Sequence, residues 1–274
     1  MRRLVAERLK ETYASLRKRR RGIIELLEFL SFAGVATLII GIGSSRLRYN
    51  WQWFRVRRYL FTVEEGSFVP GVLLEGLGVT IQISALGLFL AALFGLVAAL
   101  FRLSRSYTAN LLAQLYLEAV RNTPLLIQLF LIYFVVSPIL GITPFWSAVL
   151  ALSLFEGAYA SEIIRGAIVS IPVHQWESCY SLGLTRADTY RFVILPQALR
   201  QILPALTGQA VSLVKDSALV STIAIADLTM SGSATVSNTF LTFEIWFTVA
   251  AIYLLLNGLL SLLSHAIEAR VKIK

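Results

Sequence analysis

The sequence is poor in residues that carry metal or redox chemistry. Its single cysteine, Cys179, excludes a disulfide within the chain. The two histidines, His174 and His265, lie too far apart in sequence to suggest a metal pair. Neither a thiol nor a lone histidine without a partner motif predicts a specific reaction. We therefore expect no metal site and assign these three residues to packing or interfacial positions.

Charged residues are also scarce. They make up 15% of the 274 residues, whereas soluble domains have about 25%. Hydrophobic residues reach 57% and the mean hydropathy is +0.71. The formal net charge of +9 does not indicate a nucleic-acid partner, because the basic residues cluster at the ends of apolar segments. This composition predicts an all-α integral membrane protein embedded in a lipid bilayer.

Long apolar runs locate about six transmembrane helices, since some twenty apolar residues cross a bilayer. Six spans place both termini on one side of the membrane, and Lys and Arg are retained in cytoplasmic loops. Nine of the 25 basic residues lie in residues 1–22, so we predict cytoplasmic N- and C-termini. The predicted spans are Ile23 to Gly43, Gly76 to Phe101, Leu111 to Ser137, Phe145 to Ile168, Gln201 to Asp227 and Ile245 to Ile267.

These spans divide the chain into four parts. Residues 1–22 form a basic cytoplasmic arm and residues 23–43 a first transmembrane helix. Residues 44–70 form an extracytoplasmic interfacial loop, in which Trp, Phe, Leu and Arg between Arg46 and Phe61 predict a helix lying at headgroup level. Residues 71–274 form the main transmembrane domain. Within it, Gly87, Ala91, Gly95 and Ala99 recur every four residues and predict close helix packing.

The loop of residues 170–200 is too polar to span a membrane and too patterned to be a tether. Gly183 predicts a helix end with positive φ, and Thr185 with Asp188 has capping-box spacing. Two short helices are therefore expected to meet at Gly183, with Pro196 after the second helix and Pro204 at the start of the next span. Such a rigid pair of helices is compatible with two roles: a docking site for a separate protein, or a purely structural loop.

From Glu177 this loop reads E-S-C-x-x-x-G and then V-x-L-P ending at Pro196. It resembles the EAA loop of bacterial ABC-importer permeases, E-A-A-x-x-x-G followed by I-x-L-P, with the same spacing. Ser178 and Cys179 replace the family's alanines and Val193 its isoleucine, which are small or isosteric changes. The resemblance implies that an ATPase docks on Glu177, Ser178, Cys179, Gly183, Leu184, Thr185 and Arg186.

Other segments resemble the polar amino-acid branch of the same family (the histidine, glutamine and arginine type). Arg121 to Phe130 reads RNTPLLIQLF, near R-G-T-P-L-L-V-Q-L-F, and Lys215 to Leu219 reads KDSAL, near K-D-T-S-L. Two further segments with this resemblance are GAYASEIIRG at Gly157 to Gly166 and LPQALR at Leu195 to Arg200. The resemblance covers about Gly76 to the C-terminus. Members of this branch usually have five spans, so the first span here is an addition.

This resemblance implies the permease subunit of an ATP-binding-cassette importer in the bacterial plasma (inner) membrane, forming half of a path for polar or charged L-amino acids. The implied partners are a second permease subunit, identical or paralogous, two ATPase subunits and an extracytoplasmic amino-acid-binding protein. Nothing here resembles G-x-x-x-x-G-K-[ST], so ATP and Mg are expected on the partner ATPase. The chain is thus expected to bind no cofactor and to be no enzyme.

Polar residues in or beside the predicted spans are candidates for the substrate path, because a charge at the bilayer centre costs at least ~2.5 kcal/mol. An amino acid needs a carboxylate such as Glu156 for its ammonium and a cation such as Arg121 or Lys215 for its carboxylate; a buried interhelical salt bridge is the alternative role. Glu162 and Arg165 are spaced for an i,i+3 ion pair. The candidates are Arg121, Thr123, Glu156, Tyr159, Glu162, Lys215, Asp216 and Ser217.

Two other classes also explain charges at membrane depth. An ion-coupled secondary transporter should show repeated halves, and no motif recurs between the halves of this sequence. A membrane scaffold that moves no solute would need the charges to form structural salt bridges. As a further hypothesis, Glu156 favours a cargo with an extra positive charge, such as arginine or lysine.

Overall fold

The protein is described here by a computed structural model that covers residues 30–32, 34, 35, 37, 38, 41, 43, 49–64 and 66–271. The chain divides into two compact units, Met1–Trp51 and Gln52–Lys274. In the first unit the described positions between residues 30 and 43 are helical, as predicted for the first span. The basic arm of residues 1–22 lies outside the described residues, and its role stays a prediction.

The second unit begins with short elements rather than one flat helix. Two short helical segments, η1 (Trp53–Arg55) and α2 (Arg57–Leu60), precede a hairpin of β1 (Phe61–Glu64) and β2 (Ser67–Pro70). The antiparallel register pairs Phe61 with Pro70 and Glu64 with Ser67. Gly66 has φ +80°, a conformation that glycine adopts without steric cost. The helix predicted between Arg46 and Phe61 is thus present as short helical turns over Trp53–Leu60, and the hairpin after it was not predicted.

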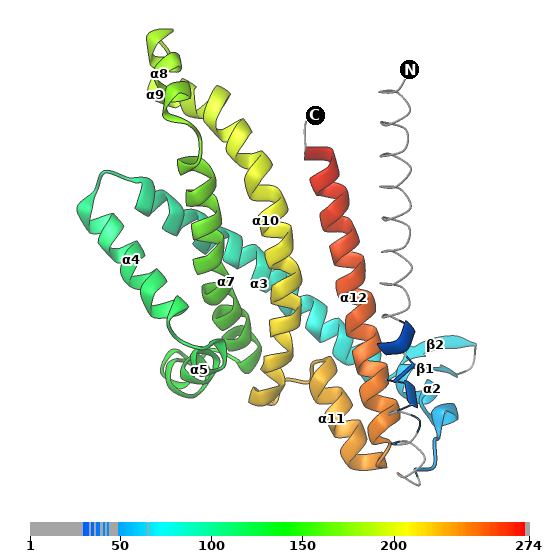
Figure 1. Cartoon of the computed structure of the whole chain (residues 1–274). Helices are drawn as coiled ribbons and strands as arrows, with labels where there is room; N and C mark the ends of the chain where they lie inside the picture. The colour runs from blue at the N-terminus through cyan, green and yellow to red at the C-terminus, as the bar shows by residue number, and fades with distance from the viewer. Residues whose placement is uncertain are drawn as a thin grey trace, which may run out of the picture. The chain divides into compact units, whose positions relative to one another are not determined.

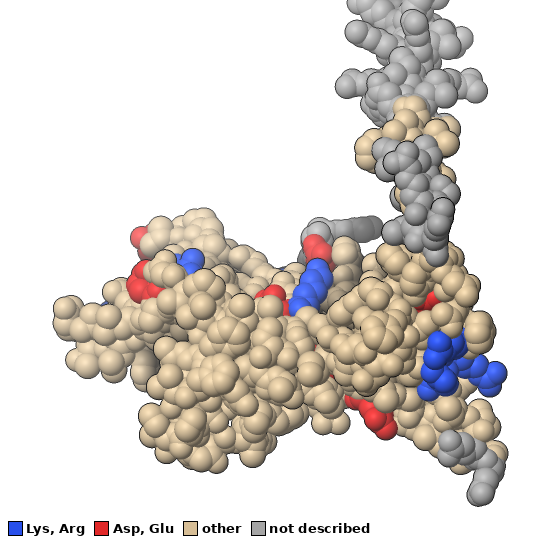
Figure 2. Space-filling model, turned by 90° about the horizontal axis from the view of Figure 1, so that it is seen from below, with Lys and Arg blue, Asp and Glu red and all other residues tan. Residues whose placement is uncertain are grey.

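Among the described residues of the second unit, three helices are long and apolar enough to cross a membrane: α3 (Val72–Leu103), α7 (Pro144–Val169) and α12, within Thr242–Val271. They contain three of the predicted spans. In the most apolar window of each, 67% of α7 is buried, against 11% of α12. The central helix is therefore α7, while α12 exposes leucines such as Leu254 and Leu262. Charged side chains occupy few positions on the face shown in Figure 2.

The predicted span Leu111 to Ser137 is interrupted by a sharp bend. It consists of α4 (Tyr107–Arg121) and a second arm made of α5 (Leu125–Leu131), the π-helical η2 (Ile132–Val136) and α6 (Ser137–Leu140), bent by 107°. Pro124 causes the break, because proline lacks an N–H and restricts the residue before it to extended backbone. Gln128 Nε2 donates to the carbonyl of Val120 (2.6 Å) that the break leaves free.

The loop after α7 contains α8 (Val173–Ser181), α9 (Arg186–Asp188) and the π-helical η3 (Thr189–Ile194), and continues without interruption into α10 (Leu195–Asp216). The expected turn at Pro196 is therefore wrong: helical backbone runs from the π-helical η3 through Pro196, the second residue of α10, and Pro204 lies inside the helix. The predicted span to Asp227 ends early, because 3-10 helix η4 (Ser217–Ile223) follows α10 and α11 (Leu228–Thr239) begins after Asp227.

The stripe of small residues on α3 packs against α7, as predicted. A Cβ on Gly95 would lie 2.6 Å from the Cβ of Ala160 and 3.0 Å from the carbonyl oxygen of Gly157. Ala91 and Ala99 are buried. The two backbones approach closely because these positions carry almost no side chain. In Figure 1, α4 and α5 lie on one side of α7 and α12 on the far side of α10, while α8 and α9 lie at the opposite end of the bundle from α11.

Candidate functional site

The first candidate site is the turn between α8 and α9, where the backbone geometry agrees with the prediction. Gly183 has φ +77°, and its N–H donates to the carbonyl of Tyr180 at 3.0 Å. A Cβ there would meet nothing within 4 Å, so the glycine serves backbone conformation and not close packing. The hydroxyl of Thr185 accepts from the N–H of Asp188 and bonds its carboxylate at 2.5 Å, which caps the following helix.

Side-chain contacts fix α8 against the long helix that follows. The rings of Trp176 and Tyr190 meet edge to face at 5.1 Å between centroids. Gln197 Nε2 donates to Gln175 Oε1 at 2.6 Å. These two contacts join α8 to η3 and to the first turns of α10, so α8 and α10 are expected to move together.

The predicted docking residues fall on two sides of this turn. Glu177, Ser178, Thr185 and Arg186 are exposed, and Leu184 is half-buried. Cys179 is 4% exposed and faces the protein's own interior, so its burial supports the packing position assigned to it and not a contact with an ATPase. Small residues in a short amphipathic helix fit either face, and packing decides which one they occupy.

The second candidate site is a cluster of charges around Glu162 on α7. One carboxylate oxygen forms an ion pair with Arg102 from the end of α3, and the other accepts from Arg165 Nη2 at 2.9 Å. Arg121 Nη1, from the last turn of α4, is 3.8 Å away, and its guanidinium lies 5.8 Å from the ring centre of Tyr159. The expected i,i+3 pair is present, and the cluster also ties three helices together.

Arg121 is the least constrained cation of this cluster. Its side chain is 44% exposed, against 20% for Arg102 and 30% for Arg165. An arginine at this distance from a carboxylate that already has two closer partners retains guanidinium N–H groups for an anionic ligand.

The third candidate site is the buried carboxylate of Glu156, 1% exposed, one and a half turns earlier on α7. Its Oε2 accepts a hydrogen bond from Gln209 Nε2 on α10, and its Oε1 has no hydrogen-bond partner among the described residues. Asp216 on α10 is an electrostatic neighbour. No ion pair joins Glu156 to a lysine or arginine within residues 49–64 and 66–271, so the alternative role of Glu156 in an interhelical salt bridge has no support there.

The remaining candidates are held apart from these clusters. Ser217 is buried and its hydroxyl donates to the carbonyl of Val214 at 2.8 Å. Thr123 uses its hydroxyl at the α4–α5 break, donating to the carbonyl of Ala119 (2.8 Å) and accepting from Gln128 Nε2 (2.7 Å). Lys215 is exposed at the end of α10 beside Asp216. The hydroxyl groups of Ser217 and Thr123 therefore already have structural partners.

Sequence reasoning missed two members of these sites. Gln209 is neutral and was not considered with the charges, although an amide at membrane depth is itself a signal because it must find a partner. Arg102 lies one residue beyond the predicted span Gly76 to Phe101, yet it belongs to the last turn of α3 and pairs across to α7. Its partner could not be found from spacing, because the two residues are 60 positions apart.

The chain is similar to known transport proteins over most of its length. The family model of the binding-protein-dependent transport system inner membrane component matches residues 91–273. The glutamine transport system permease protein GlnP of Escherichia coli (strain K12) is 39% identical over 205 residues, covering 74% of this chain and 94% of that protein. The L-cystine transport system permease protein TcyB of Bacillus subtilis (strain 168) is 40% identical over 208 residues, covering 75% and 88%.

Solved structures agree with these relatives. One chain of an amino acid ABC transporter crystallised with histidines superposes with a TM-score of 0.69 at 38% identity, over 73% of this chain and 94% of that one. A chain of the inward-facing MetNI methionine ABC transporter superposes with a TM-score of 0.65 at 20% identity and shows similarity of fold alone.

Proposed function

Since this chain belongs to the family of binding-protein-dependent transport system inner membrane components and is a permease subunit of an amino-acid ABC importer, we propose that it couples to its ATPase through α8 and the Gly183 turn. The single observation that carries this proposal is the positive φ of Gly183, which turns the chain so that α8 presents Glu177 to solvent. An exposed short helix with a fixed orientation is suited to a groove on another protein.

The contacts behind α8 support a role in transmitting motion. A partner that displaces α8 also displaces Tyr190 in η3 and Gln197 at the start of α10. Because helix α10 is continuous from Leu195 to Asp216, this displacement reaches the Gln209 that holds Glu156. Rigid-body rocking of packed helices is a common way in which transporters alternate access.

We assign the polar side chains on α4, α7 and α10 to a path for polar or charged L-amino acids. Arg121 supplies guanidinium N–H groups for the cargo's carboxylate, and Glu156 supplies an oxygen without a described partner for an ammonium group. A carboxylate at this position favours a cargo with an extra positive charge. The relatives include the arginine transport system permease protein ArtQ of Bacillus subtilis (strain 168), 33% identical over 202 residues.

The chain forms half of this path in our proposal. The other half comes from a second permease subunit, identical or paralogous, and two ATPase subunits bind ATP and Mg below it. An extracytoplasmic amino-acid-binding protein delivers the cargo, and both termini of the chain lie in the cytoplasm. The end of the bundle that carries α8 and α9 is then the cytoplasmic end.

Amino-acid uptake into proteoliposomes, with the ATPase and the binding protein added, tests this proposal. Gly183→Pro should abolish ATP-dependent uptake and co-purification of the ATPase, because proline requires φ near about −65° and has no N–H for Tyr180. Gly141→Pro is the matched control: Gly141 also has positive φ, +67°, and donates its N–H to Ser137, but lies at the α6–α7 turn. It should leave co-purification of the ATPase unchanged.

Two results would contradict the proposal. Uptake that follows an ion gradient without any ATPase, and survives Gly183→Pro, would indicate a secondary transporter instead. Equal loss of the ATPase from both proline variants would mean that general disruption of a turn, and not the α8 surface, explains the effect.

A further inference from the structure

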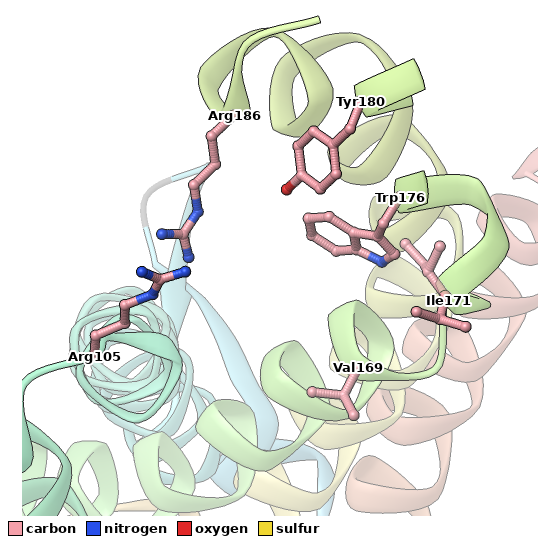
Figure 3. A pocket seen from close by; sticks show the side chains of 7 residues that line it. Arg105, Val169, Ile171, Trp176, Tyr180 and Arg186 are labelled. Atoms are coloured by element: carbon pink, nitrogen blue, oxygen red, sulfur yellow. The ribbon is translucent and has the colours of Figure 1, made fainter. Parts of the chain in front are cut away.

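A cavity of about 450 Å³ lies between α8 and the ends of two other helices (Figure 3). Arg105 from the α3–α4 connection and Arg186 from the start of α9 line it on one side. Val169 and Ile171, from the end of α7, and the rings of Trp176 and Tyr180, from α8, complete most of its wall. The cavity is thus basic on one side and apolar to aromatic on the other.

On their side of the cavity, the two arginines point their guanidinium groups toward one another (Figure 3). Both side chains are exposed. Within residues 49–64 and 66–271 no acidic side chain forms an ion pair with either of them, whereas Arg102, Arg121 and Arg165 share Glu162. Two like charges directed at one space repel each other unless an anion lies between them. The guanidinium fork matches the oxygens of a phosphate group in particular.

The position of the cavity relative to the ends of the membrane-spanning helices indicates which kind of molecule supplies such an anion. Two helices that are apolar and long enough to cross a membrane end beside it, α3 at Leu103 and α7 at Val169. The cavity therefore lies where the hydrocarbon core gives way to headgroups. Tryptophan and tyrosine are enriched at this level, and basic pockets between transmembrane helices on the cytoplasmic side bind lipid headgroups.

We propose that this cavity binds the phosphate of an anionic phospholipid, with Arg105 and Arg186 contacting the headgroup and Trp176 and Tyr180 lying at the interface. The lipid would bridge the α3–α4 connection to the start of α9, next to the Gly183 turn. Assigning it to the cytoplasmic leaflet rests on the orientation proposed above. Binding itself does not depend on the ATPase, so it can be measured separately from docking.

The test is native mass spectrometry of the assembled transporter, permease with its ATPase, taken from nanodiscs that contain equal amounts of phosphatidylcholine and phosphatidylglycerol. The wild type should retain phosphatidylglycerol in preference to phosphatidylcholine. At about 1 kcal/mol per basic residue, one arginine-to-glutamine change should weaken retention about fivefold and the pair R105Q/R186Q about thirtyfold. Arg200→Gln is the control, because Arg200 is also exposed and lines no part of this cavity.

R105K/R186K keeps both charges but loses the guanidinium forks, so it should retain more lipid than the glutamine pair and less than the wild type. Equal retention in the wild type and R105Q/R186Q would overturn the proposal. So would displacement by millimolar inorganic phosphate without lipid preference, which would assign the cavity to free phosphate. Unchanged lipid retention with loss of the ATPase from the glutamine pair would assign it instead to an acidic side chain of the ATPase.

Discussion

Replacing Glu162 by glutamine tests whether the three-helix charge cluster holds the bundle together. The change keeps the size of the side chain but removes the charge that Arg102, Arg121 and Arg165 share. Removing one partner of a fully buried pair costs about 3–5 kcal/mol, whereas exposed pairs contribute about 0.2–1 kcal/mol. The side chain of Glu162 is 25% exposed, so we expect an intermediate loss of about 2 kcal/mol in the free energy of unfolding.

A double-mutant cycle in mixed micelles, followed by tryptophan fluorescence during detergent-induced unfolding, divides this loss between the arginines. The coupling energy of Glu162 with Arg102 should be about 1–2 kcal/mol, because Arg102 is the least exposed of the three arginines, at 20%. The coupling with Arg121, at 3.8 Å and 44% exposed, should stay below about 0.5 kcal/mol.

Glu118→Gln is the matched control for this cycle. Glu118 is an exposed acid on α4 whose carboxylate accepts from Asn122 Nδ2 at 2.7 Å. It interacts electrostatically with Arg102 but forms no ion pair with it among the described residues. Its replacement should change stability by less than about 0.5 kcal/mol. Equal losses for Glu162→Gln and Glu118→Gln, or a stronger coupling to Arg121 than to Arg102, would refute the reasoning.

Three further substitutions test other parts of the structure. Glu156→Gln should reduce the preference for basic over neutral amino acids in competitive uptake about tenfold, since about 1.4 kcal/mol of charge interaction is lost, and an unchanged ranking would remove Glu156 from cargo selection. Gly95→Ala should lower the free energy of unfolding by about 1–3 kcal/mol, because its Cβ would lie 2.6 Å from that of Ala160. Its control is Gly208→Ala, which has open space around the added Cβ and should not lower the thermal unfolding midpoint. Thr185→Ala should lower the free energy of unfolding by about 0.5–2 kcal/mol, because the helix cap is lost, and should weaken co-purification of the ATPase. Unchanged hydrogen exchange of the Asp188 amide would contradict the capping role.

Local features of the sequence predicted much of the fold. The spans within α3, α7 and α12 follow from hydropathy, because a long apolar run in a helix satisfies its own backbone hydrogen bonds and leaves its side chains for lipid. The positive φ of Gly183 and the cap at Thr185 also follow from residue type, since both depend on chain neighbours a few positions away.

Proline effects were predicted less well, because the same residue breaks one helix and continues another. Pro124 ends α4, where the side chains of Thr123 and Gln128 bond the carbonyls left free. Pro204 lies inside α10, and the helix continues through it. Which outcome occurs depends on whether neighbouring groups satisfy the freed backbone atoms, and that is a tertiary property.

By itself, the sequence determined that this is a helical membrane protein, where its longest spans lie, and which family motifs it carries in order. The tertiary structure alone decided which polar groups meet. Glu162 gathers arginines from three helices, Gln209 holds Glu156, and Arg105 lies beside Arg186 on one side of a cavity. Residues this far apart in sequence come together through helix crossing and rotation, which depend on the packing of whole faces rather than on local composition.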